Sequence, residues 1–184
     1  MFKVFDHIVP FHHQQDIYNA CKNAFYRING WEDRDDIDIS KHDLHSKWSL
    51  EDTKKTNLYP YVEQVLKKSG YDVNSYKYSM QDFDATMVNI SKKGDYYYSH
   101  THGEGCLIIL YYANLEWREE WAGETIFFDK HTREAKDVCS YKSGRFIVFE
   151  GDAPHSVRPQ SIIGPEYRFT IGTFLKKKLI TQPF

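Results

Sequence analysis

Short β-rich segments fill the chain from residue 76 onward, and they limit its possible folds more than any other feature. Gly, Asp, Asn and Pro separate these segments. Because side chains alternate between the two faces of a strand, such short apolar runs are typical of packed antiparallel sheets. The sequence predicts strands over 85–91, 96–102, 106–113, 125–129, 146–150 and 168–175, with a further short strand near the N-terminus over 2–10.

The first third of the chain has helical patterns. Apolar residues recur at helical spacing over 12–26. A second helix is predicted over 57–69, because Pro60 suits its first turn and Gly70 follows its end. The acidic run 32–38 between them is expected to be a solvated loop or a mobile lid.

These patterns fit a single domain over residues 1–184, with helical support over 1–75 and a β-barrel core over 76–176. A chain of 184 residues can bury one substantial core. The expected fold class is mostly β with N-terminal helices, arranged as an antiparallel β-sandwich or barrel.

Charge and cysteine content narrow the choice of partners and compartment. The 24 Lys and Arg residues nearly balance 26 Asp and Glu, so no strong nucleic-acid signal is present. Neither a signal-peptide-like segment nor an apolar run of membrane-spanning length occurs. The three cysteines are widely spaced and odd in number, which fits reduced thiols. We therefore expect a cytoplasmic protein without a membrane partner.

A histidine pair is the strongest chemical signal. His100 and His102 would project from one face of a strand, and a glycine-containing turn follows at Gly103 and Gly105. A third histidine, His155, follows an apolar strand and a turn. Converging neutral imidazoles suit Fe, Zn, Cu or Ni. Taken alone, the pair could also be two surface histidines on a hairpin.

An arginine in an apolar strand is the second signal. Arg168 and Thr170 share one face of the predicted strand, and Phe169 and Ile171 share the other. A buried guanidinium needs a partner. That partner is either the carboxylate of a ligand, which a guanidinium binds well, or an internal Asp or Glu.

The order of these segments resembles the 2-oxoglutarate and Fe(II)-dependent dioxygenases, closest to their prolyl 4-hydroxylase-like branch. The resemblance covers about residues 85–175. It rests on the segments Tyr97-Tyr98-Ser99-His100-Thr101-His102, Leu110-Tyr111-Tyr112-Ala113-Asn114, Ala122-Gly123-Glu124-Thr125, Ser143-Gly144-Arg145-Phe146 before His155, and Arg168-Phe169-Thr170.

The resemblance implies a double-stranded β-helix, that is, a jelly roll or cupin-like barrel. It implies an enzyme that uses O2 and 2-oxoglutarate to hydroxylate a substrate, either a protein prolyl residue or a small molecule, with release of succinate and CO2. The implied ligands are His100, His102 and His155 for Fe(II), and Arg168, Tyr112 and Thr170 for 2-oxoglutarate.

The chain departs from this family at His102, where the family has Asp. We favour three histidine ligands, because His100 keeps its offset from Tyr97 and a loop follows His102. Two alternatives remain open. The second ligand could be Glu104, or His100 could bind without His102 and leave a vacant position, as in the halogenating relatives of these enzymes.

Two other classes are less well supported. The spacing from Gly94 to His100 and His102 is similar to the first cupin motif, but the residues expected after the second and third histidines are absent. In a cupin-like, non-enzymatic metal-binding protein, Arg168 would form only a structural pair. A zinc hydrolase would lack an evident general base other than Glu104.

Overall fold

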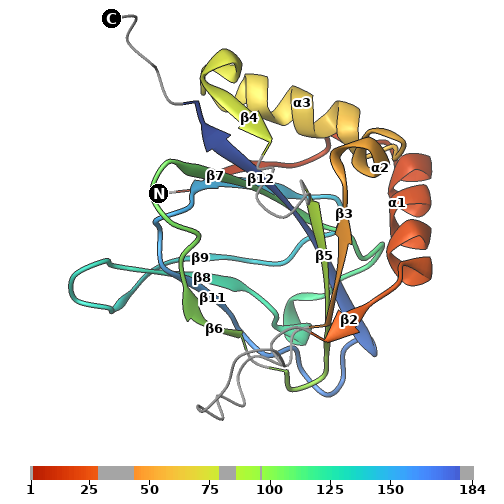
Figure 1. Ribbon diagram of the computed structural model, residues 1–184. Helices are drawn as coiled ribbons and strands as arrows, with labels where there is room; N and C mark the ends of the chain where they lie inside the picture. The colour runs from red at the N-terminus through yellow and green to blue at the C-terminus, as the bar shows by residue number, and fades with distance from the viewer. Residues whose placement is uncertain (1, 29–43, 79–85, 96, 179–184) are drawn as a thin grey trace, which may run out of the picture.

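Two antiparallel β-sheets pack face to face in this computed structural model, which describes residues 2–28, 44–78, 86–95 and 97–178 (Figure 1). The larger sheet has the strand order β1-β10-β7-β12-β5-β3-β2, and β4 also pairs with β12. Its strands are β1 (Lys3–Phe5), β2 (Arg27–Ile28), β3 (Leu44–Trp48), β4 (Tyr76–Tyr78), β5 (Thr86–Lys92), β7 (Cys106–Tyr112), β10 (Phe146–Glu150) and β12 (Tyr167–Lys177). The smaller sheet has the order β6-β11-β8-β9 and comprises β6 (Tyr97–His100), β8 (Thr125–Phe128), β9 (Ala135–Cys139) and β11 (His155–Val157).

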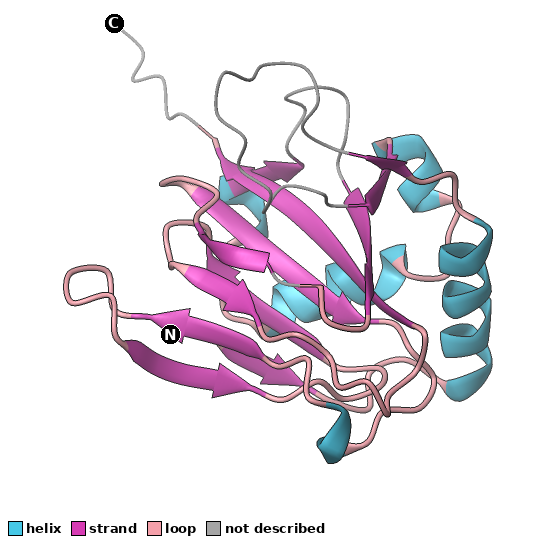
Figure 2. Cartoon of the chain, turned by 90° about the horizontal axis from the view of Figure 1, so that it is seen from below, coloured by secondary structure: helices cyan, strands magenta, loops and turns pink. Residues whose placement is uncertain are grey.

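Helices cover the outer face of the larger sheet (Figure 2). They are α1 (Phe11–Asn23), α2 (Leu50–Lys54) and α3 (Tyr59–Lys68). Ile17 and Cys21 lie one turn apart on α1 and are fully buried, as are Val62 and Leu66 on α3. The amphipathic spacing in the sequence therefore becomes one helical layer on the sheet. None of the helices in the described part of the chain has the length and hydrophobicity needed to cross a bilayer.

Strand alternation divides the interior into two cores. On β7, Leu107 and Ile109 face the helices, whereas Ile108 and Tyr112 face the smaller sheet. Burial on both faces explains why β7 reads as an unbroken apolar run. The space between the two sheets is the interior of a jelly roll, and it contains the candidate site.

The fold class is the predicted one, a mostly β jelly roll with N-terminal helices, but several elements differ from the predictions. The expected strand over 96–102 ends at His100. The first 75 residues contribute the predicted N-terminal strand β1 to the larger sheet and, in addition to the helices, the unpredicted strands β2 and β3. The strands β3 and β9 were missed because polar residues interrupt their patterns. The acidic run 32–38 lies outside the described residues.

Candidate metal centre and ligand pocket

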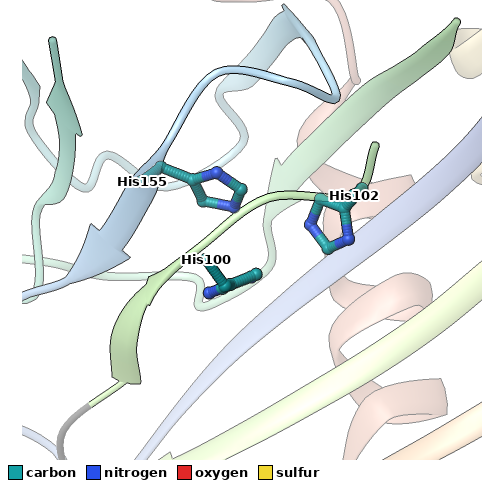
Figure 3. A group of neighbouring side chains, drawn as sticks. All are labelled: His100, His102 and His155. Carbon is teal, nitrogen blue, oxygen red and sulfur yellow. The ribbon is translucent and has the colours of Figure 1, made fainter. Parts of the chain in front are cut away.

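Three histidine rings meet in the space between the two sheets (Figure 3). His100 on β6 pairs directly with His155 on β11, and their ring centroids are 4.4 Å apart. The ring of His102 lies 5.0 Å from that of His100 and 5.2 Å from that of His155. One ring nitrogen from each residue lies within 4.8 Å of the others. This group can chelate a metal ion.

His102 reaches the group from a loop and not from the strand on which it was expected. β6 ends at His100, so alternation along a strand does not explain the arrangement. Instead, the His102 backbone N–H donates to the Gly151 carbonyl at 2.6 Å, which ties this loop to the turn before His155. Gly103 follows with φ of +88°, a conformation that favours glycine. Glu104 is exposed and is not among the converging residues.

Backbone contacts fix the ring nitrogens of two histidines. His100 Nδ1 lies 2.9 Å from the Tyr98 carbonyl, and His155 Nδ1 lies 2.9 Å from the Ala153 carbonyl. Because a carbonyl only accepts, each Nδ1 carries the proton in these hydrogen bonds. The lone pair of each ring is then on Nε2, as in metal sites where a carbonyl orients the ligating imidazole.

Burial keeps two of the imidazoles neutral. Burial, with a smaller contribution from the neighbouring histidines, lowers the pKa of His102 to about 3 and that of His155 to about 4. Both rings are therefore neutral at pH 7, which is the form that binds metal.

A cavity of about 230 Å³ adjoins the histidines. Both sheets contribute to its wall, which consists of Met87, Asn89, Tyr97, His100, His102, Ile108, Leu110, Thr125, Phe149, His155, Val157, Arg168, Thr170, Gly172 and Phe174. Among these described lining residues none is acidic. A small ligand that is itself negatively charged would therefore meet only neutral or cationic groups.

Arg168 is the cation in this wall, and it is only 2% exposed. Its Nε donates to the Gly123 carbonyl at 3.2 Å. Its Cζ lies 4.9 Å from the centre of the Tyr141 ring and 5.8 Å from that of Tyr112. Within the described residues, its Nη2 is buried without a hydrogen-bond partner. A buried, unpaired guanidinium nitrogen is costly unless a ligand satisfies it.

The two other predicted cosubstrate residues lie in different positions. Thr170 lines the cavity on the same strand face as Arg168. Tyr112 is fully buried but does not line the cavity, and its hydroxyl lies 2.7 Å from Thr125 Oγ1. Burial raises the pKa of this phenol, so it remains protonated.

Several lining residues were not singled out from the sequence. Phe174 packs at 5.0 Å against His102, and its even spacing from Arg168 could have placed it on the same face. Thr125 belongs to a recognised Gly-Glu-Thr turn, but its side chain was given no role. Asn89 and Tyr97 come from predicted strands whose facing the sequence left open.

Solved structures with the same fold include two prolyl hydroxylases and an oxoacid-bound protein. A prolyl hydroxylase in complex with a hypoxia inducible factor oxygen degradation domain peptide fragment from Trichoplax adhaerens matches with a TM-score of 0.69 and 16% identity, over 96% of this chain and 82% of that one. A Pseudomonas putida prolyl-4-hydroxylase matches with a TM-score of 0.64 and 15% identity, over 96% of this chain and 92% of that one. HygX from Streptomyces hygroscopicus, with nickel and 2-oxoglutarate bound, matches with a TM-score of 0.66 and 9% identity, over 98% of this chain and 84% of that one. No family model and no curated protein matches the sequence. The chain therefore has the prolyl hydroxylase-like jelly-roll fold.

Proposed function

We propose that this protein is an Fe(II)- and 2-oxoglutarate-dependent oxygenase that hydroxylates a prolyl residue or a small molecule. The observation that carries the proposal is one cavity lined both by three converging imidazoles and by a buried guanidinium with an unpaired nitrogen. A metal-binding group and a carboxylate-binding group in one small cavity suit a ligand that is both a chelator and a carboxylate.

The donor set fits a divalent transition metal. His100, His102 and His155 would hold it through neutral imidazole nitrogens, which suit Fe(II) and exclude a preference for Mg or Ca. When bound, Fe(II) supplies the activation of O2 that drives oxidation of the cosubstrate and substrate. The contribution of the chain is to orient the ligands and to limit the access of water to the cavity.

Arg168 and Thr170 would hold the carboxylate of 2-oxoglutarate that is remote from the metal. Both side chains reach the cavity from β12, whereas the three histidines reach the same cavity from β6, β11 and the loop after β6. Tyr112 would act indirectly, by fixing the hydroxyl of Thr125.

The alternatives are less well supported by the same residues. In a halogenase-like variant, His102 would turn away from the metal, yet its ring lies beside the other two. In a cupin-like binding protein, Arg168 would be internally paired, yet its Nη2 lacks a partner among the described residues.

Succinate formation tests this function. The Fe(II)-loaded protein should convert 2-oxoglutarate to succinate in air, and prolyl peptides and small molecules in a panel should gain the mass of one oxygen atom. Arg168→Ala should raise the KM for 2-oxoglutarate at least tenfold, because a charge-assisted pair is lost. The matched control Arg118→Ala removes an exposed arginine and should have no effect. No succinate from any substrate in the panel would contradict the proposal.

A further inference from the structure

Arg168 lies in the first part of β12, which extends beyond the end of its neighbour β7. The regular pairing between these strands ends at Tyr112 opposite Thr170, and one further bond joins the Ala113 N–H to the Phe169 carbonyl at 3.1 Å. Beyond this point the backbone of β7 no longer supports β12 on that side. On its other edge β12 stays paired with β5, where Arg168 lies opposite Ser91. The β12 backbone groups that face the β7 side still need another hydrogen-bond partner.

The side chain of Asn114 takes the place of the missing strand. Its Nδ2 donates to the Tyr167 carbonyl at 2.9 Å, and its Oδ1 accepts from the Phe169 N–H at 2.8 Å. These two backbone groups flank Arg168 directly. One planar amide therefore pairs with β12 on both sides of the arginine, as a neighbouring strand would.

Tyr141 connects this amide to the guanidinium. Its hydroxyl lies 2.7 Å from both Asn114 Oδ1 and the Phe169 carbonyl, and it accepts from the Asn114 N–H at 3.0 Å. Its ring lies 4.9 Å from Arg168 Cζ, within the range of a cation–π contact. Trp117 packs on the same ring at 4.1 Å and restricts its movement.

We propose that Asn114 and Tyr141 are positioning residues that set the orientation of Arg168 for its carboxylate ligand. The proposal rests on the proposed function, because it assigns them a role in 2-oxoglutarate binding. A guanidinium pairs with a carboxylate through a flat fork, so a rotated side chain loses one of two hydrogen bonds. Neither residue lines the cavity, so neither is expected to touch the ligand itself.

Tyr141→Phe provides the sharper test, because it keeps the ring and removes only the hydroxyl. The matched control is Tyr111→Phe, since the Tyr111 hydroxyl is also buried and has no partner among the described residues. Binding of Mn(II), and of 2-oxoglutarate to the Mn(II)-loaded protein, would be measured by calorimetry without O2. KM and kcat for 2-oxoglutarate would follow with Fe(II).

Tyr141→Phe should raise the Kd and KM for 2-oxoglutarate by up to about tenfold, as expected for one lost hydrogen bond, with the Mn(II) Kd and kcat unchanged. Tyr111→Phe should change none of these. Asn114→Ala should have the larger effect, provided that its circular dichroism matches the wild type. This inference alone would be overturned if the wild type binds 2-oxoglutarate and the Kd of Tyr141→Phe lies within twofold of the wild-type value. It would also be overturned if Tyr141→Phe weakened Mn(II) binding as much as 2-oxoglutarate binding. No binding of 2-oxoglutarate to the wild type would overturn the proposed function as well.

Discussion

His100 and His155 lie opposite each other on paired strands, and each places its Nδ1 against the carbonyl two residues earlier in its own chain segment. The backbone therefore orients the two rings, and the lone pair of each Nε2 is left to bind a metal ion. Both carbonyl contacts are made within the protein itself. The predictions below follow from this arrangement and from the cavity beside it.

Removing either strand histidine should abolish tight metal binding. His155→Ala should weaken Mn(II) or Co(II) binding by at least about a hundredfold, because it removes one of three ligands in a single step. Calorimetry and metal analysis after gel filtration measure this. His131→Ala removes an exposed histidine outside the group and serves as the control. Metal retention by His155→Ala equal to that of the control would exclude this site.

Introducing a carboxylate at residue 102 should change the coupling between metal binding and 2-oxoglutarate binding. Three neutral imidazoles leave the full charge of the metal uncompensated, so a dianionic chelator should strengthen metal binding in the wild type. His102→Asp supplies one negative charge from the protein and should reduce that coupling. Co(II) titrations with and without 2-oxoglutarate measure it for both proteins. Equal coupling in both would show that the charge at residue 102 does not control ligand binding.

The stability of the metal-free protein should depend on pH through its buried histidines. The pKa of His102 is about 3 and that of His155 about 4 in the folded protein, whereas an unfolded histidine has about 6.5. Below pH 6.5 the unfolded state takes up protons that the folded state does not, so stability falls as the pH falls from 6.5 toward 4. Urea unfolding in EDTA at several pH values measures the slope. His102→Leu should flatten it, and a slope that this variant leaves unchanged would contradict the assignment.

A strained residue, Ala122, lies next to the glycine whose carbonyl accepts a hydrogen bond from Arg168. Ala122 has φ of +56° and ψ of −142°, a conformation that favours glycine, and it precedes the Gly123 carbonyl that holds Arg168. Ala122→Gly should therefore stabilise the protein by up to about 1 kcal/mol, since relief of strain exceeds the entropic cost of glycine. Thermal unfolding of wild type and variant provides the measurement. A lower Tm for the glycine variant would show that the backbone is not strained there.

The sequence correctly predicted the features that depend only on the local alternation of side chains along a strand. Arg168 and Thr170 share the cavity face because alternation along a strand does not depend on distant residues. His102 was expected on a strand because the i, i+2 spacing gives no sign that β6 ends at His100. The bond from His102 to Gly151, which replaces that strand, joins residues 49 positions apart.

Other features depended on contacts that no local pattern encodes. Tyr112 was expected at the cosubstrate, but its hydroxyl is directed to Thr125 by packing against Tyr141. The pairing of Asn114 with residues on either side of Arg168 requires β7 and β12 to be neighbours with a known register. Topology had to be determined before these roles could be assigned.

The most direct test of the central claim is an anaerobic titration of the Fe(II)-loaded protein with 2-oxoglutarate, followed by visible absorption. Chelation of Fe(II) by the oxo-acid end of the ligand should produce a charge-transfer band in the wild type. Arg168→Ala should require at least tenfold more 2-oxoglutarate for the same band, and His155→Ala should show none. A wild-type protein that binds Fe(II) but gives no band at saturating 2-oxoglutarate would contradict the account.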